Sequence, residues 1–469
     1  MTRKPWPVLF LFAALACVPT VVLSQQKRSE LAREFQVAVA HYNEGKLDAA
    51  ASELETLAKQ VPDSFEINEL LGMIYARESQ DVVANQYLEK AVRLKPASAA
   101  ARNNLAANLV RLGRLDAARV QLERSVALDP KGFDANHNLG EIYVRMGKLP
   151  EAIPFLKQAQ QLNPSYDNGY DLAMAYLLTG NTRLARQVVQ TLLKEKNTAE
   201  LHNLLGQIEE KDGQYVVAAN EFETAAHQDP SESNLFDWAS ELLMHRTLEP
   251  AIEVFRQSAE RYPNSARMAI GLGIALYSRG NYDESIQSLL RASDLSPNDP
   301  RCYFFLSKAY DSSPKQADQV IDRFRRFSEL EPGNAKAQYY YAMSLWKGKR
   351  AQDPGLDLHQ IQSLLKQALA IDPKLADAYL QLGNLDSDQG RYRDAIAQYE
   401  KAIEFSPDVA DAHYRLAQAY VHTGEKDKAQ PQFEVYQRLR AQHLAELDRQ
   451  IADIRQFVSS EKEDTSAKP

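Results

Sequence analysis

The chain has 469 residues, of which 44% are hydrophobic and 25% are charged, a composition typical of a soluble globular protein. Its formal net charge of −8, without a long basic run, argues against a nucleic-acid-binding protein. The length alone would predict several domains, but the internal periodicity described below replaces that expectation.

The first 24 residues have the pattern of a secretory signal peptide. Arg3 and Lys4 precede an apolar run over residues 8–23, and the small side chain of Ser24 fits cleavage after that residue. The run is short for a membrane-spanning helix and contains Pro19, although an uncleaved anchor is an alternative. The sequence therefore predicts an exported protein, periplasmic or secreted, or else a membrane-anchored protein that faces the extracytoplasmic side.

The two cysteines have different predicted roles. Cys17 ends the segment Ala-Leu-Ala-Cys, which resembles a bacterial lipoprotein box in an altered order, so a lipid on Cys17 is a further way to reach a membrane. Without the leader, Cys302 is the only cysteine and no internal disulfide can form. Cys302 precedes Tyr303 and two phenylalanines, which predicts a small core residue and not a nucleophile.

One pattern recurs along the chain after a short polar segment, residues 25–30, which we interpret as a linker. Apolar residues three or four apart predict two helices in each copy, with a turn between them. Successive early copies end in prolines that are each 34 residues apart: Pro62, Pro96, Pro130 and Pro164. Such a constant period is the sequence signature of a repeat architecture.

The clearest copy, residues 376–407, shows what each position does. Gly383 and Ala395 are small because the two helices of the copy are expected to cross there at close range. Gly390 allows the chain to turn without a Cβ clash, and Pro407 ends the second helix. A single hairpin cannot bury its apolar face alone, so the copies must stack.

This pattern resembles the tetratricopeptide repeat, which has a W-x2-L-G-x2-Y, then A-x3-F, then P signature over 34 residues. The resemblance implies an all-α, right-handed superhelical solenoid of about twelve helix-turn-helix units. Residues 31–332 would hold about nine repeats and residues 333–458 about three, the last of them extended into a long capping helix. Residues 459–469 are small and charged and are predicted to be disordered.

Three irregularities predict where the stack bends. Arg246 replaces the turn glycine of the seventh repeat, and Pro314 stands at the turn of the ninth. The tenth repeat carries extra residues near positions 348–358. We therefore expect a larger array before residue 332, a smaller one after it, and a joint between them.

The resemblance also implies that the first helices of the repeats line a concave groove, which binds a peptide or another protein. The N-terminal part of this groove is predicted to be polar, where Asn104 and Asn138 resemble a ladder that binds a peptide backbone. For Tyr339, Tyr340 and Trp346, packing between repeats is an open alternative to the groove. The candidate groove residues of the later, more apolar part are Tyr170, Met174, Phe236, Ile274, Tyr277, Tyr339, Tyr340, Met343 and Trp346.

The sequence contains no motif that indicates catalysis or a cofactor. It has no glycine-rich phosphate loop, no G-x-S-x-G elbow and no H-E-x-x-H zinc motif. His137, His202 and His413 occur once per first helix, without the spacing of a metal site, and are predicted to be surface or groove residues. No catalytic, cofactor-binding or metal-binding residue is predicted.

These observations favour a scaffold for protein–protein interaction, without enzymatic activity, that acts in an extracytoplasmic assembly or transport process. One alternative is a structural adaptor tethered to a membrane by the leader or by a lipid on Cys17. Another is a regulatory subunit of an enzyme complex. An enzyme fused to the repeats would need a catalytic domain, for which almost no unassigned sequence is left.

Overall fold

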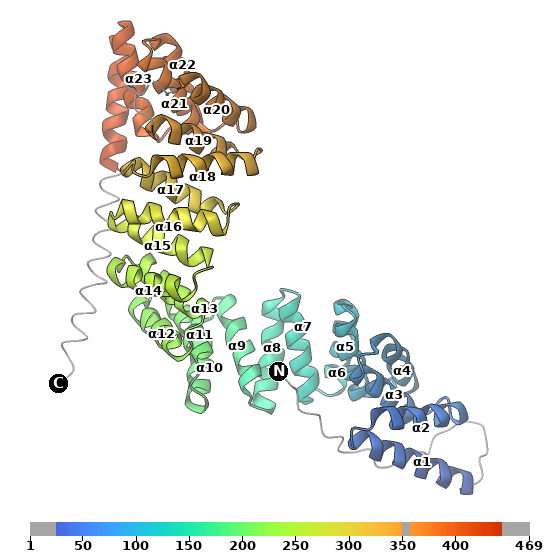
Figure 1. Cartoon of the computed structure of the whole chain (residues 1–469). Coiled ribbons are helices and arrows are strands. Elements are labelled where there is room, and N and C mark those ends of the chain that lie inside the picture. Colours follow the sequence, from blue (N-terminus) through green and yellow to red (C-terminus); the bar gives the residue numbers. More distant parts are fainter. Residues whose placement is uncertain (1–24, 349–356, 443–469) are drawn as a thin grey trace, which may run out of the picture. The chain divides into compact units, whose positions relative to one another are not determined.

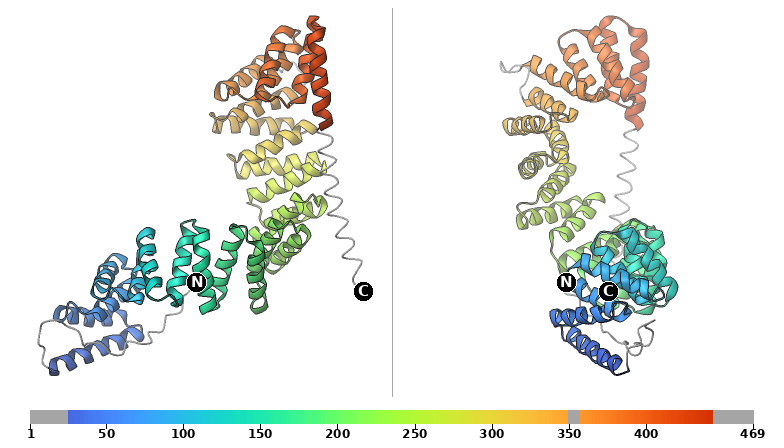
Figure 2. Two further views of the ribbon diagram at one scale, coloured as in Figure 1. Left: turned by 180° about the vertical axis from the view of Figure 1, so that it is seen from behind. Right: turned by 90° about the vertical axis from the view of Figure 1, so that its right-hand side faces the viewer.

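The computed structural model describes residues 25–348 and 357–442, and these residues form helices joined by short turns, with no strand among them. The chain divides into two compact units, Met1–Asn197 and Thr198–Pro469. Within each unit the helices stack in the order of the sequence, as Figure 1 and Figure 2 show. The predicted all-α helical-repeat solenoid is confirmed.

The first unit contains five helix pairs, each made of a first and a second helix. Each second helix packs against the first helix of its own pair and, within the unit, against that of the next. The helices are α1 (Gln25–Asn43), α2 (Leu47–Gln60), α3 (Phe65–Arg77), α4 (Asp81–Leu94), α5 (Ala99–Arg111), α6 (Leu115–Leu128), α7 (Phe133–Arg145), α8 (Leu149–Leu162), α9 (Tyr166–Leu178) and α10 (Thr182–Glu195).

The second unit continues the same pairing. Residues 426–442 form the second helix of its last pair and are described only to residue 442. The other helices are α11 (Ala199–Lys211), α12 (Tyr215–Gln228), α13 (Glu232–Met244), α14 (Leu248–Arg261), α15 (Ala266–Arg279), α16 (Tyr282–Leu295), α17 (Pro300–Ser312), α18 (Ala317–Leu330), α19 (Ala335–Gly348), α20 (Leu358–Ile371), α21 (Ala376–Asp388), α22 (Tyr392–Phe405) and α23 (Ala410–Thr423).

Two predicted boundaries differ from the structure. Residues 25–30, interpreted as a linker, are the start of α1, because glutamine, lysine, arginine and glutamate favour a helix that then buries Leu31. The division between units falls at Asn197, where the fifth repeat lacks a terminal proline, and not near residue 332. One buried cluster extends from α15 to α19, so packing continues past residue 332.

Several other predictions concern residues outside the described part of the chain. These are the leader, residues 1–24, most of the insertion, residues 349–356, and the capping helix beyond residue 442 with the tail after it. They stay predictions.

The turn within most pairs uses a glycine in the left-handed region, such as Gly390 with a φ of 71°. Three pairs lack this glycine. Ser79 and Arg246 occupy its place in the turn, two residues before the second helix, whereas Gln316 directly precedes α18 as its N-cap residue. Ser79, Arg246 and Gln316 have φ values of 62°, 57° and 59° and are the non-glycine residues with positive φ in the described part. An L-residue there is strained by about 1–2 kcal/mol, so stacking imposes this turn even where the sequence opposes it.

The close crossing of the two helices in a pair is confirmed. A Cβ atom added to Gly383 would lie 2.5 Å from Cε1 of Tyr399, and Ala395 is fully buried. Gly72 and Gly273 occupy the same helix position, and in each a Cβ would lie 2.5 Å from a leucine Cγ on the partner helix. A small residue at this crossing is therefore required by the packing of the two helices in both units.

Candidate partner-binding faces

The first helices of successive repeats contact one another within each unit. In the first unit this is true of α3 with α5, α5 with α7, and α7 with α9. In the second unit the contacts run from α11 through α13, α15 and α17 to α19, and again from α21 to α23. The first helices therefore form a continuous face from α3 to α9 in the first unit and from α11 to α19 in the second, and the predicted groove residues lie on these helices.

In the first unit this face is a chain of hydrogen bonds between neighbouring first helices. Asn104 Nδ2 donates to Glu69 Oε1 at 3.4 Å, and Asn138 Nδ2 donates to Asn103 Oδ1 at 2.8 Å. His137 Nδ1 lies 3.1 Å from Asn168 Oδ1 in the next helix. The amide groups of Asn104 and Asn138 thus join one repeat to the preceding one, a structural role that their spacing alone did not predict.

Buried carboxyl groups accompany this ladder. Glu69 is largely buried, and burial raises its pKa to about 7. The hydrogen bond from Asn104 lowers the pKa, but by less than burial raises it. Burial also raises the pKa values of Asp134 and Asp171. The polar face of the first unit therefore contains acids that are protonated more easily than exposed ones.

A hollow of about 280 Å³ opens between α5 and α7 on the same face. Its lining includes the apolar residues Val110 and Ile142 together with Asn138 and charged residues. Among the charged residues, Arg145 donates to Glu141 at 2.6 Å. The hollow thus combines apolar and hydrogen-bonding groups, as a site for a side chain of a partner would.

Two predicted groove residues lie on α9, which is the first helix of the last pair in this unit. Tyr170 stacks on Tyr166 with ring centroids 6.4 Å apart, and Met174 is partly exposed one turn further along. The apolar character predicted for the later groove thus begins at the end of the first unit.

In the second unit the face of the first helices carries aromatic and aliphatic side chains from α13 to α19, after a polar contact of Asn203 on α11 with Asp237 on α13. Phe236 packs edge-on against Phe255 at 6.0 Å and lies under the guanidinium of Arg267 at 5.1 Å. Ile274 and Tyr277, on α15, are partly buried against the core cluster that includes α17. Each of these predicted residues is partly exposed and held by packing.

The most exposed aromatic residue on this face was not predicted. Phe304 has an exposed fraction of 40%, lies 5.0 Å edge-on from Phe305, and has Lys308 Nζ 5.8 Å from its ring centroid. Phe305 in turn contacts Tyr277 at 6.3 Å. The signal in the sequence is the position within the helix: Phe304 is the fifth residue of α17, as Tyr339 is of α19, but Pro314 at the turn of the ninth repeat obscures this position.

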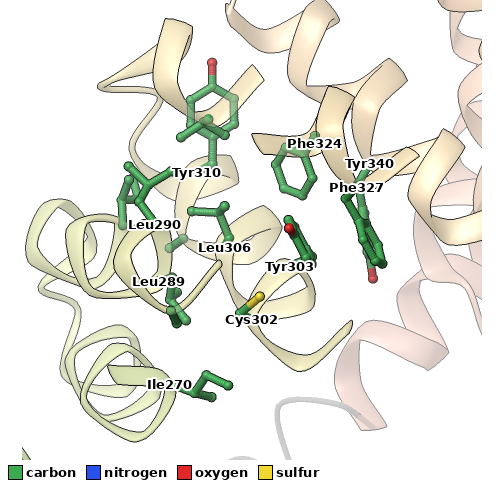
Figure 3. Close-up of a cluster of buried hydrophobic side chains, with 14 of the residues drawn as sticks. Ile270, Leu289, Leu290, Cys302, Tyr303, Leu306, Tyr310, Phe324, Phe327 and Tyr340 are labelled. Carbon is green, nitrogen blue, oxygen red and sulfur yellow. The ribbon is translucent and has the colours of Figure 1, made fainter. Parts of the chain in front are cut away.

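Among the four candidates on α19, Tyr340 is a core residue and not a groove residue. Its exposed fraction is 8%, and it packs against Phe324 at 5.7 Å in the cluster of Figure 3. Tyr339 is partly exposed, and burial against its neighbours raises its pKa. Met343 and Trp346 are also partly exposed. Tyr339 and Trp346 also pack against the buried cluster that joins α19 to α20 and α21.

Two further sequence predictions are decided by burial. Cys302 is fully buried, and burial raises its pKa to about 12, which confirms a core thiol (Figure 3). His413 is also buried, contrary to prediction, because its ring bridges the carbonyl of Pro407 at 3.0 Å and Gln432 at 2.6 Å. Asn68 and Asn136, each the fourth residue of its helix like His413, donate to the carbonyl oxygens of the repeat-ending prolines Pro62 and Pro130. This fourth position therefore holds the repeat together.

None of the described helices combines the length and the apolar character needed to cross a membrane. Models of the tetratricopeptide repeat family match much of the chain, in agreement with the helix pairs. The matched residues are 38–99, 83–132, 103–167, 143–208, 236–300, 383–424 and 410–443.

Curated relatives are similar over part of their length. The human mitochondrial import receptor subunit TOM70 is 26% identical over 247 residues, which are 50% of this chain and 40% of the relative. The human protein O-mannosyl-transferase TMTC1 is 24% identical over 34% of this chain and 18% of the relative. The chain thus matches about two fifths of the length of the TOM70 relative and 18% of the length of TMTC1.

Among solved structures, the yeast Tom70 crystal structure aligns over 92% of this chain and 97% of its own, with 16% identity and a TM-score of 0.37. Naa15/Naa10 bound to HypK-THB aligns over 87% of this chain and 68% of its own, with 17% identity and a TM-score of 0.40.

Proposed function

Because the chain is a tetratricopeptide repeat protein, a scaffold for protein–protein interaction, we propose that it holds a segment of a partner protein on the first helices of its second unit. The observation that carries this proposal is the exposed Phe304 beside Phe305 and Tyr277. Clustered aromatic side chains on one exposed face usually belong to an interface, where they supply most of the binding energy. The partner segment would offer apolar side chains to this face.

The charge near this face suggests which partner is preferred. Lys308 lies against Phe304, and Arg267 lies against Phe236, so cations flank the aromatic rings. A segment with apolar anchors and an acidic neighbour would suit the rings and Lys308, whereas Arg267 already pairs with Glu232 at 2.5 Å. The similarity to a protein named as an import receptor subunit supports a role in receiving other polypeptides, although it covers only part of that relative.

We also propose that the protein works outside the cytoplasm, either free after cleavage of the leader or tethered by it. The support is the basic start and the apolar run over residues 8–23. The mass of the protein purified from its native fraction tests this: loss of the first 24 residues supports export with cleavage. A full-length mass without lipid, together with recovery from the cytoplasm, would refute it.

Site-specific crosslinking tests the binding face. A photoreactive phenylalanine analogue would replace Phe304 in one variant and Leu330, at the end of the second helix α18, in a matched control. The control residue has an exposed fraction of 50% and is also apolar, so exposure and hydrophobicity are matched while the face differs.

We expect a discrete crosslinked partner from position 304, competed by excess unmodified protein, and none from position 330. Peptide mapping should place the crosslink in a partner segment with apolar side chains. The same partners at both positions, or none at position 304, would refute binding on the first helices.

A further inference from the structure

Three side chains with metal-ligand chemistry converge at the C-terminal ends of two neighbouring first helices of the second unit. Glu210 lies on α11, Glu241 lies on α13, and His245 directly follows α13. One ligand atom from each lies within 4.8 Å of the other two. His245 Nε2 is 3.1 Å from Glu210 Oε2 and 3.4 Å from Glu241 Oε1.

The buried carboxyl of Glu241 is the observation that points to a ligand. The residue has an exposed fraction of 1%, and its Oε1, which faces His245, has no hydrogen-bond partner. A buried carboxylate oxygen that accepts no hydrogen bond is costly unless a proton or a cation neutralises the group.

The imidazole of this group is held in place. Tyr215, the first residue of α12, stacks on the His245 ring with centroids 3.9 Å apart. Arg246 then takes the left-handed conformation that turns the chain into the next helix. The side chains of His245 and Glu210 retain exposed fractions of 18% and 32%, so an ion could enter from solvent.

We propose that Glu210, Glu241 and His245 bind a divalent transition-metal ion that connects the first helices of the sixth and seventh repeats. One imidazole nitrogen and two carboxylate oxygens match the ligands of zinc, with water at the fourth position. The nitrogen ligand distinguishes this set from the all-oxygen sites that calcium and magnesium prefer. The site lies at the ends of α11 and α13, whereas the aromatic residues that carry the proposed binding face, Tyr277 and Phe304, lie on α15 and α17.

The test uses the tag-free full chain, stripped with a chelator and titrated with zinc chloride by calorimetry. Two variants, Glu241→Gln and His245→Gln, each remove one ligand and keep a similar size. The matched control is His202→Gln, which removes another histidine paired with a glutamate, Glu221, on the same unit. Circular dichroism would verify that each variant is helical.

We expect one zinc equivalent for the wild type and the control, and an affinity at least a hundredfold lower for both ligand variants. Zinc should raise the unfolding temperature of the wild type and the control only. Equal zinc binding by wild type and His245→Gln, or no zinc binding by the wild type, would overturn the proposal. If Glu241→Gln fails to fold, the His245→Gln result decides alone.

Discussion

The two compact units share a framework but present different chemistry on their first helices. The fifth residue of these helices shows the difference most simply. It is Glu69, Asn103 and His137 on α3, α5 and α7 of the first unit, and Phe236, Phe304 and Tyr339 on α13, α17 and α19 of the second. The former make polar contacts with their neighbours, whereas the latter pack against aromatic or charged side chains and stay partly exposed. The helices next to the division between the units have the opposite character, with Tyr170 on α9 and Asn203 on α11.

This difference teaches which positions the fold constrains. The small residue at each helix crossing and the left-handed turn recur in both units, because the helices cannot stack without them. The residue types on the face of the first helices differ between the units, and in the first unit some of them also bond neighbouring repeats. This face is therefore less constrained than the helix crossings, and its chemistry can suit a partner. The comparison predicts equal responses to framework changes and unequal responses to changes on the face.

The largest expected effect on stability comes from the polar face of the first unit. With a pKa raised from 4.5 to about 7, Glu69 must ionise in a buried place when the pH rises above 7. Glu69→Gln should therefore stabilise the protein at pH 8 by up to about 3 kcal/mol, and the gain should vanish near pH 4. Calorimetric unfolding at both pH values measures this.

The control for that prediction is Glu151→Gln, which changes an exposed glutamate on α8. It should alter the unfolding temperature little at either pH. If Glu69→Gln is neutral at pH 8, or stabilises more at pH 4 than at pH 8, the buried-acid account of this face is wrong.

The next effect should be the same in both units. Gly72→Ala and Gly273→Ala each place a Cβ 2.5 Å from a leucine Cγ, and each should cost roughly 1–2 kcal/mol after the gain in helix propensity. Urea denaturation would compare them with Ala106→Gly, at the same position of the third repeat. A clear loss of stability in only one unit would contradict a common framework.

The smallest effect concerns the turns that lack glycine. Ser79→Gly in the first unit and Gln316→Gly in the second should each stabilise by about 1 kcal/mol, because glycine adopts positive φ without strain. Gly113→Ser should destabilise by a similar amount. Thermal melts of the three variants check the signs, and a destabilised Ser79→Gly would show that the serine contributes more than its backbone conformation costs.

The repeat framework could be predicted from the sequence because it depends on local residue types at fixed spacing. Gly383, Ala395 and the terminal prolines carry their structural reasons in the sequence itself. The true start of α1 was missed because polar residues 25–30 lack an apolar stripe, although they favour a helix. The division at Asn197 depends on contacts between elements, which spacing does not reveal.

The face was harder to predict, because one helical position decides whether an aromatic residue is exposed or buried. Tyr339 and Tyr340 are adjacent, yet the second is in the core, and only the exact start of α19 separates them. Phe304 was missed for the same reason, since Pro314 obscured the register of its repeat. The cluster of Glu210, Glu241 and His245 joins two repeats and had no local signal.

The most direct measurement is the affinity of a crosslinked partner segment for two double variants. Phe304→Ser with Tyr277→Ser removes aromatic side chains from the second unit, and Asn104→Ala with Asn138→Ala removes the ladder amides of the first. With both variants helical by circular dichroism, the account predicts at least tenfold weaker binding for the former and a change within about twofold for the latter. Equal losses, or a loss only in the asparagine variant, would contradict the assignment of the binding face to the second unit.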